Sequence, residues 1–200
     1  ENLWIQPAAG DAGGALGCAL AAWHQYAEKL RRPNGRADQM QGAYLGPRFS
    51  NNQVTGELDN FGAIYQQLQD DLLFERLAGL LDEGKIVGWF QGRMEFGPRA
   101  LGGRSILGDP RNPEMQSVMN LKIKYRESFR PFAPAVLAEC VSDYFEQKRD
   151  SPYMLIVANV KHHRRNDISM EDRNLFGINK LKLLRSDIPA VTHVDYSARI

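Results

Sequence analysis

The stretch QGRMEFGPRALGGRSILGDP, at residues 91–110, constrains the fold of this chain more than any other feature. It follows KIVGWF, an apolar run typical of a buried strand, and residues 91–103 contain four glycines and a proline. Because these residues interrupt long helices and flat strands, residues 91–103 are predicted to form a shaped loop at the end of a strand. Loops of this kind, carried by a rigid strand, are common positions for binding sites.

The same loop carries more positive charge than its own acids can neutralise. Arg93, Arg99 and Arg104 lie within twelve residues, and the acids nearby in sequence are Glu95 and Asp109. A guanidinium group is planar and pairs well with the oxygens of a phosphate or a carboxylate. The surplus predicts a pocket for an external anion. Ion pairs with acids elsewhere in the chain are the open alternative.

A second basic segment, NLKIKYRESFRPFAPAVL, occupies residues 120–137. If residues 123–126 are extended, Lys124 and Arg126 share one face, and the proline after Arg130 biases that residue toward an extended conformation. Six arginines and two lysines stand against four acids between residues 93 and 130, which is +4 in a chain of formal net charge +1. This concentration predicts a compact polyphosphate site, with a solvated basic face as the alternative.

The remaining pattern alternates helices and strands and predicts an α/β fold, with α+β also open. Helices are predicted at 14–30, 70–84, after Asn112-Pro113, at 139–146 and at 171–176. Strands are predicted ahead of the glycine-rich turn near the N-terminus and at 85–90, 131–137, 153–160 and 189–194. Residues 31–60, rich in Pro, Gly, Asn and Arg, are predicted to form a linker.

The glycine-rich turn GDAGGALG, at residues 10–17, precedes the first predicted helix. Backbone N–H groups there, with Gly13 and Gly14 as candidates, are suited to hold a nucleotide phosphate, while a tight packing turn is the alternative. The pattern matches neither a P-loop nor a dinucleotide-binding fingerprint. Asp11 is a candidate metal ligand or, alternatively, a helix N-cap.

Near the end of the chain, THVDYSAR gathers polar residues after a predicted strand: His193, Asp195, Ser197 and Arg199. Their spacing predicts no catalytic triad. The two cysteines form no metal-binding pattern, and no apolar run reaches the roughly 18 residues of a membrane span. We therefore expect a soluble cytoplasmic protein without membrane partners, and the small net charge argues against nucleic acid.

These motifs carry a family likeness. FQGRMEFGPRALGGRSILGDPR and NLKIKYRESFRPFAPAVL closely resemble the C-terminal region of NodU/CmcH-type O-carbamoyltransferases, and GDAGGALG and HVDYSAR resemble their flanking motifs. The resemblance implies that residues 1–30 end an actin-like (ASKHA) domain and that 31–60 are a linker. Residues 61–200 would form a YrdC-like domain, a twisted mixed sheet with flanking helices.

The resemblance also implies a reaction and its participants. A YrdC-like domain makes carbamoyl-adenylate from carbamoyl phosphate and ATP with Mg, and the N-terminal domain, with an iron site, passes the carbamoyl group to a hydroxyl of a small-molecule or sugar acceptor. Lys124 and Arg126 look like the catalytic KxR element. The implied phosphate, carbamoyl or nucleotide contacts are Arg93, Arg99, Arg104, Arg130, His193, Asp195 and Arg199. Glu95 would orient an arginine or help hold Mg, and Asp11 would match a metal-ligand aspartate.

Family members continue past the SAR segment to an NTSFN-like motif, so we expect a fragment that cannot complete carbamoyl transfer alone. Two rival functions stay open. One is synthesis of another carbamoyl-adenylate, such as threonylcarbamoyl-adenylate for tRNA modification, and the other is a non-catalytic RNA-binding module. The second needs stacking aromatics, whereas the aromatics among the basic residues are expected in the core. They are Phe96, Tyr125, Phe129 and Phe132.

Overall fold

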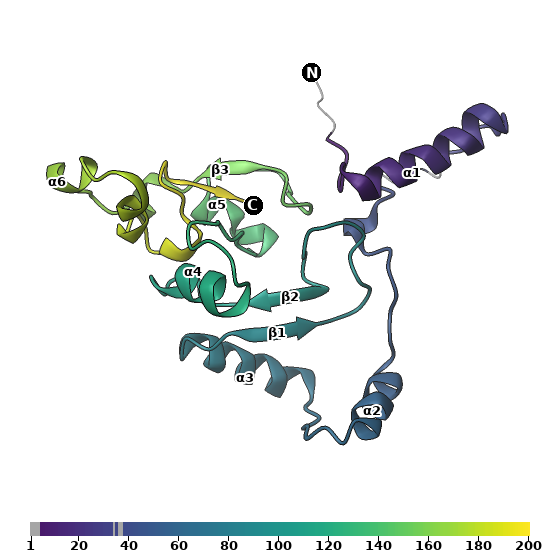
Figure 1. Cartoon of the computed structure of the whole chain (residues 1–200), viewed down its shortest axis with the longest axis horizontal. Coiled ribbons are helices and arrows are strands. Elements are labelled where there is room, and N and C mark those ends of the chain that lie inside the picture. The colour runs from purple at the N-terminus through teal and green to yellow at the C-terminus, as the bar shows by residue number, and fades with distance from the viewer. Residues whose placement is uncertain (1–4, 34, 36–37) are drawn as a thin grey trace. The chain divides into compact units, whose positions relative to one another are not determined.

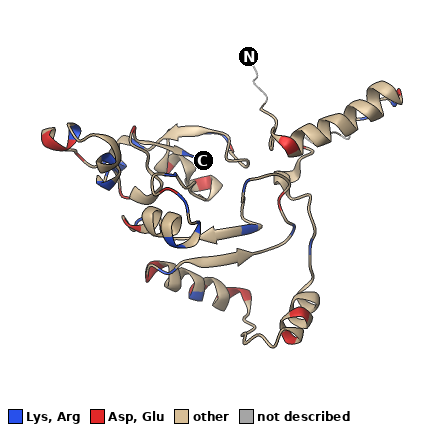
Figure 2. Ribbon diagram, in the orientation of Figure 1, with Lys and Arg blue, Asp and Glu red and all other residues tan. Residues whose placement is uncertain are grey.

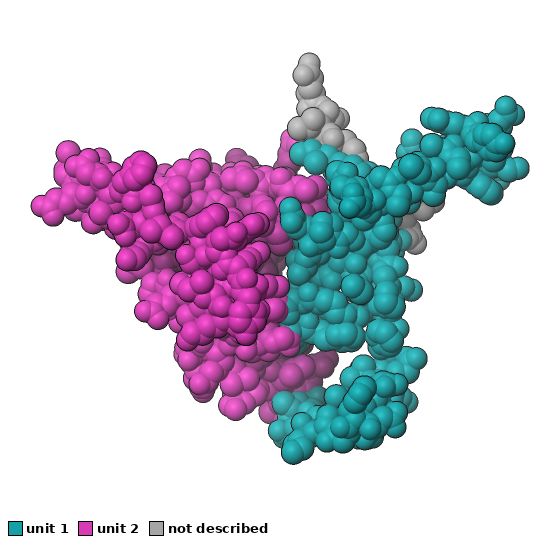
Figure 3. Space-filling view, viewed as in Figure 1, with its two compact units in different colours: residues 1–68, 89–105 teal, residues 69–88, 106–200 magenta. Residues whose placement is uncertain are grey.

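The computed structural model of this chain describes residues 5–33, 35 and 38–200 (Figure 1). Helices alternate with two small antiparallel sheets, β1 with β2 and β3 with β4, an arrangement consistent with the α/β class. The chain forms two compact units (Figure 3). The first unit contains residues 1–68 and 89–105, and the second contains residues 69–88 and 106–200.

The first unit begins with helix α1, Asp11–Ala21, which continues into a π-helical turn, Ala22–Tyr26. The predicted helix is therefore confirmed, but it starts earlier than residue 14 and ends earlier than residue 30. Gly10 is the N-cap and Asp11 the first helical residue, so the N-cap role expected as the alternative for Asp11 is wrong. The short strand predicted ahead of this turn falls partly on residues 1–4, which lie outside the described residues, and residues 5 and 6 are not part of a strand.

The segment predicted as a linker contains helix α2, Asn51–Asn60, and a 3-10 turn, Gln41–Ala43. Ser50 caps α2 through a capping box, because the Gln53 amide donates to Ser50 Oγ at 3.3 Å and the Ser50 amide donates to Gln53 Oε1 at 2.8 Å. Apolar periodicity misses such a helix, since its signal lies in the polar cap. The domain boundaries stay a prediction.

Backbone hydrogen bonds join residues 43–47 to residues 94–96, and we call this pair of segments the 43–47/94–96 ribbon. The amide of Gly46 donates to the Met94 carbonyl at 2.9 Å, and the Met94 amide donates to the Pro47 carbonyl at 2.9 Å. The amide of Phe96 donates to the carbonyl of Ala43 at 2.6 Å. The ribbon fixes the start of the arginine-rich loop against a segment about fifty residues away in sequence.

Helix α3, Asp70–Asp82, and strand β1, Val87–Phe90, confirm the helix and strand predicted there. Gly84 lies at φ +76°, a left-handed conformation that ends the helix as expected. Strand β2, Arg104–Leu107, pairs with β1 and was outside the predicted strands. The boundary between the two units falls within both strands.

Helix α4, Met115–Val118, continues into a π-helical turn, Met119–Ile123. The predicted short helix is confirmed, although its N-cap is Glu114. The side chain of Asn112 instead accepts a hydrogen bond from the Glu114 amide at 2.9 Å, within the turn before the helix.

Residues 123–126 are not extended, so the strand face predicted for Lys124 and Arg126 is wrong. Lys124 has right-handed helical backbone angles at the end of the π-helical turn, and Tyr125 follows with φ +48°. The helical segment that starts at residue 115 continues to residue 123, although the alternation of charged and apolar side chains suggested a strand there.

Two other predicted strands are also wrong. Residues 131–137, all of which the structure describes, are irregular, and residues 189–194 contain a 3-10 turn, Pro189–Val191. Both segments contain prolines, which cannot donate to a strand ladder. The strand predicted at 153–160 shortens to β3, Val157–Asn159, which pairs antiparallel with β4, Ser197–Arg199.

The remaining elements of the second unit are short helical segments. The predicted helices near 139 and 171 are confirmed in part. In chain order they are a 3-10 turn at Ala138–Cys140, α5 at Val141–Tyr144, a 3-10 turn at His162–Arg164, α6 at Met170–Arg173 and a 3-10 turn at Gly177–Lys182. No helix within the described ranges is both long and apolar enough to cross a membrane.

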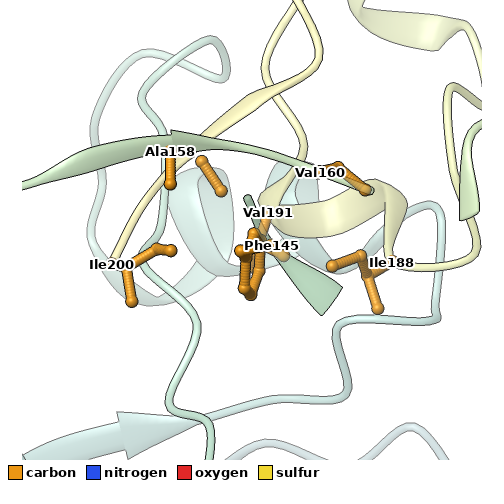
Figure 4. Packing of buried hydrophobic residues seen from close by; sticks show 7 residues of the cluster. Phe145, Ala158, Val160, Ile188, Val191 and Ile200 are labelled. Atoms are coloured by element: carbon orange, nitrogen blue, oxygen red, sulfur yellow. The ribbon is translucent and has the colours of Figure 1, made fainter. Parts of the chain in front are cut away.

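The core of the second unit is built around Phe145, whose side chain has an exposed fraction of 0% (Figure 4). The β3–β4 register sets Ala158 opposite Ala198, and both side chains join this core. The full cluster is Phe145, Ala158, Val160, Ile188, Val191, Ala198 and Ile200. Removing a buried aromatic ring of this kind costs about 3–5 kcal/mol, so this cluster holds the chain's last residues in place.

Candidate functional site

Residues 91–103 form the predicted loop, and Glu95 organises it from inside. The residue is 7% exposed, and Oε1 accepts backbone hydrogen bonds from Leu101 and Gly103 at 2.7 Å and from Arg104 at 3.2 Å. Burial raises the pKa of this carboxyl, but the N–H donors outweigh it and hold the pKa below its ordinary value. Glu95 therefore anchors the loop as an ionised carboxylate and holds the backbone of an arginine.

Gly103 lies against the same carboxylate. A Cβ atom at this position would lie 2.6 Å from the Arg93 carbonyl oxygen and 3.1 Å from the Glu95 carboxyl carbon. Because no side chain fits in that space, glycine permits the close approach of the loop backbone to Glu95.

The guanidinium group of Arg104 braces the base of the loop. It lies 3.4 Å from the centroid of the Phe90 ring and donates to the carbonyl oxygens of Gly103, Gln91 and Gly92, at 2.7, 3.1 and 3.4 Å. Within the described residues this guanidinium pairs with backbone and ring and not with an acid.

Arg93 and Arg99 make fewer contacts with the described residues than Arg104 does. Arg93 Nη1 donates to the Gly46 carbonyl at 2.9 Å, and Arg99 is exposed, with no hydrogen bond or ion pair to the residues that the structure describes. None of the three loop arginines has an acid partner in that part of the chain. The surplus charge is therefore not neutralised by internal ion pairs.

A pocket of about 390 Å³ opens beside this loop within the first unit. Its lining includes Tyr44, Arg48, Gln91, Gly92, Arg93 and Gly103. Arg48 was not among the predicted site residues, because it lies far from the arginine-rich stretch in sequence. The 43–47/94–96 ribbon ends immediately before it and brings it to the pocket.

In the second unit, Asn120 holds the loop that carries the predicted KxR element. Its side chain is 0% exposed, Nδ2 donates to the carbonyls of Ser128 and Arg130 at 3.2 and 2.8 Å, and Oδ1 accepts from Arg126 Nε at 2.7 Å. Sequence reasoning missed Asn120; the available signal was an amide set directly between the apolar residues Met119 and Leu121. Each polar atom of the amide has a partner, so the loop 124–130 is ordered from within.

The basic residues of this loop differ in how they are engaged, and lysines and arginines are distributed over both units (Figure 2). Lys124 is exposed, and its ammonium group makes no hydrogen bond or ion pair to the described part of the chain. Arg126 stacks 5.0 Å from the Phe132 ring centroid. Arg130 pairs with Glu127 at 3.1 Å, but both side chains are about half exposed and such a pair is worth little.

Two aromatics of this loop are exposed, contrary to the expectation that they belong to the core. Tyr125 is 86% exposed, in a left-handed conformation between Lys124 and Arg126, and Phe129 is 55% exposed. Phe96 and Phe132 are partly buried. The reason is the helical turn before Tyr125, which removes the strand alternation that would have buried it.

His193, Asp195 and Ser197 lie together at the turn before β4. Ser197 Oγ donates to Asp195 Oδ1 at 2.6 Å and lies 3.1 Å from His193 Nδ1. The serine sits between the other two, whereas a catalytic triad places the histidine in the middle, so the geometry agrees with the prediction of no triad. Burial lowers the pKa of His193, and hydrogen bonds from Ser197 lower that of Asp195. Arg199 lies in β4, opposite Val157.

At the N-terminal end of α1, the amides expected to hold a phosphate are already engaged. Gly13 donates to the Ala8 carbonyl at 2.7 Å and Gly14 donates to Gly10 at 2.8 Å, which favours the tight-turn alternative. Asp11 supplies a single carboxylate. Across the described residues, no group of three or more His, Cys, Asp and Glu side chains is placed to hold a metal ion.

A second pocket, of about 300 Å³, lies within the second unit and is mainly apolar, with Pro134, Val136 and Phe145 in its lining. Asp109 and Arg111 also line it. Arg111 pairs with Asp109 through both carboxylate oxygens and with Asp82 at 2.6 Å, and the Arg111 hydrogen bonds lower the pKa of Asp109 although burial raises it. One guanidinium group thus pairs with two carboxylates, and its bond to Asp82 ties this segment to the end of α3.

Residues 78–200 match the family described as carbamoyltransferase C-terminus. The chain belongs to this carbamoyltransferase family. An uncharacterized protein of Synechocystis is 61% identical over the whole chain, which covers 33% of that protein. The nodulation protein NolO of Bradyrhizobium diazoefficiens is 37% identical over the whole chain, which covers 33% of that protein. Nodulation protein U of Rhizobium fredii is 30% identical over the whole chain, which covers 28% of that protein.

The carbamoyltransferase C-terminus match includes the KxR loop, the whole arginine-rich loop and the His193 turn. The chain spans about a third of the length of the curated relatives it matches. The resemblance read from the motifs is thereby confirmed at the level of the family.

Proposed function

We propose that this chain is the part of an O-carbamoyltransferase that binds carbamoyl phosphate and ATP and forms carbamoyl-adenylate. The observation that carries the proposal is the pairing of family membership with cations that have no acid partner among the described residues. Lys124 projects from a loop held by the buried Asn120, and Arg93 and Arg99 lack acid partners in the described residues. Fixed cations of this kind stabilise the negative charge that develops when pyrophosphate leaves.

In this proposal Lys124 and Arg126 contact the reacting phosphates. Arg130, Arg93, Arg99, Arg104 and Arg199 provide further phosphate or carbamoyl contacts, together with His193 and Asp195. Arg104 is the weakest of these candidates, because its guanidinium already donates to three carbonyl groups.

The proposal includes Mg²⁺ bound with ATP. Mg²⁺ bound to nucleotide phosphates neutralises charge and usually keeps water ligands, so it needs few carboxylates from the protein. The described residues, with Asp11 alone, do not form a protein-held metal centre. No catalytic step of the proposal is therefore assigned to a metal held by these residues.

The YrdC-like architecture of residues 61–200 and the actin-like remnant at 1–30 are part of the same proposal. So are the cytoplasmic location and a small-molecule or sugar hydroxyl as the acceptor. Their support is the resemblance of the four motifs together with the family match.

The test is the release of pyrophosphate from ATP, measured with and without carbamoyl phosphate. One arm uses this chain and a second uses the chain extended through the NTSFN-like segment of its relatives. We expect release that depends on carbamoyl phosphate in the extended arm, and its loss in Lys124→Ala and Arg126→Ala. Arg76→Ala, an exposed arginine of α3, is the matched control. Unchanged release in both loop variants would contradict the assignment.

A second candidate function, binding of single-stranded RNA, is favoured by one observation. Tyr125 and Phe129 are exposed among Lys124, Arg126 and Arg130, which is the arrangement that stacks bases over a basic surface. Salt-dependent RNA binding that ATP does not displace would support it. Tyr125→Ala should then weaken binding by about 1–3 kcal/mol, while Tyr26→Ala, an equally exposed tyrosine of the first unit, should not.

A further inference from the structure

We propose that Arg48 and Arg93 form an oxyanion-binding site within the first unit, in the pocket beside the 91–103 loop, and that its ligand is a phosphate group. Arg48 is the new residue in this assignment, since it lies outside the arginine-rich motifs. Both arginines line the same pocket of about 390 Å³, which has room for a phosphate or a pyrophosphate.

The charge of this pocket is unbalanced. Arg48 is exposed and makes no hydrogen bond or ion pair to the residues that the structure describes. Arg93 uses one of its five N–H donors, on the Gly46 carbonyl. No acidic side chain is among the described lining residues. Two guanidinium groups without an acid select for an anion, and their planar forks suit phosphate oxygens.

The backbone carbonyl groups around the pocket are already engaged, so they repel an anion less. Arg104 takes the carbonyls of Gln91, Gly92 and Gly103, and the Tyr44 hydroxyl donates to the carbonyl of Leu101. Arg104 thus has a supporting role here: it neutralises the partial negative charges next to the site and leaves the other two arginines available.

The ribbon orders the backbone directly before Arg48. The Met94 amide donates to the carbonyl of Pro47, the residue directly before Arg48, and the Gly46 amide donates to the Met94 carbonyl. The backbone on each side of the pocket is therefore ordered before any ligand binds, which lowers the entropic cost of binding.

The choice of phosphate over another oxyanion rests on the proposed function, but the site does not require Lys124 or Arg126. Binding is measured by isothermal titration at low salt with the whole chain, using inorganic pyrophosphate, inorganic phosphate and acetate in separate arms. We expect pyrophosphate to bind more tightly than phosphate, and acetate to bind weakly. Both Arg48→Gln and Arg93→Gln should weaken pyrophosphate binding about tenfold or more, and Arg48→Lys should weaken it less because it keeps the charge but loses the fork.

Arg76→Gln, which removes one exposed arginine from the second unit, is the control and should bind pyrophosphate as the parent chain does. Melting temperatures verify that the variants are folded. The site assignment is overturned if Arg48→Gln binds pyrophosphate like the parent, if Arg76→Gln weakens binding equally, or if the parent does not bind pyrophosphate. Preferential binding of acetate would overturn the choice of phosphate. If Arg48→Gln loses pyrophosphate binding while carbamoyl phosphate-dependent release is absent from the extended chain, the proposed function fails and the site stands.

Discussion

Oε1 of Glu95 lies 2.7 Å from the backbone nitrogen of Gly103, and this contact ties the two ends of the arginine-rich loop together. The glycine permits the close approach and the carboxylate provides the hydrogen-bond acceptor, so both residues are needed for this contact. With this anchor, the loop presents its arginines from a fixed backbone.

Replacing Glu95 by Gln should destabilise the first unit by about 2–3 kcal/mol. The amide keeps the shape of the side chain, but it loses the negative charge that three backbone N–H groups face and places an NH₂ group among donors. Urea denaturation measures the change. Glu57→Gln, an exposed acid of α2 in the same unit, should change the free energy of unfolding by less than about 0.5 kcal/mol. Equal effects in the two variants would contradict the anchoring role.

Two glycine substitutions should have opposite signs. Gly103→Ala forces a Cβ atom to within 2.6 Å of the Arg93 carbonyl oxygen and should destabilise the chain by about 1–3 kcal/mol. Gly79→Ala lies inside α3 with open space around the new methyl group and should stabilise it by about 0.5–1 kcal/mol. Thermal melts measure the melting temperatures of the two variants, which should shift in opposite directions from that of the parent chain. A stable Gly103→Ala variant would mean that the loop backbone relaxes away from Glu95.

Asn120→Ala should loosen the loop 124–130 without unfolding the second unit's core. The substitution leaves the carbonyls of Ser128 and Arg130 and the Arg126 Nε group without their amide partner, at a cost of about 1–3 kcal/mol. Hydrogen exchange should accelerate at the amides of residues 124 and 126 and stay slow in β3. Asn174→Ala, at the end of the short helix α6, is a control with no such network in the described residues. If exchange at the amide of residue 126 were unchanged, Asn120 would not be the residue that holds this loop.

Stability should fall as the pH falls below the ordinary histidine pKa of about 6.5. Burial lowers the pKa of His193, so the unfolded chain binds a proton more readily than the folded chain does. The stabilisation is therefore complete above about 6.5 and is lost as the pH decreases toward the folded-state value. Urea denaturation at pH 7.5 and 5.5 should show a smaller pH dependence in His193→Gln than in the parent chain. His163→Gln, an exposed histidine, should keep the dependence of the parent.

Local signals of the sequence predicted a good part of this molecule. The leucine pattern and Gly84 correctly predicted α3 and its end, the apolar run predicted β1, and the glycines and Pro98 predicted the loop between β1 and β2. These features depend on neighbours within a few residues, where propensity and turn chemistry act directly. The motifs also predicted the family.

Tertiary structure decided the features that depend on distant contacts. Lys124 and Arg126 lie after a helical turn because Asn120 is buried and holds the following loop, a network that strand alternation could not reveal. Arg48 reaches the arginine pocket because backbone hydrogen bonds join residues 43–47 to 94–96. The sequence by itself determined which charges and which local turns this chain has. Only the fold decided which guanidinium groups are engaged by the backbone and which are left to bind an anion, because those hydrogen bonds connect segments far apart in the chain.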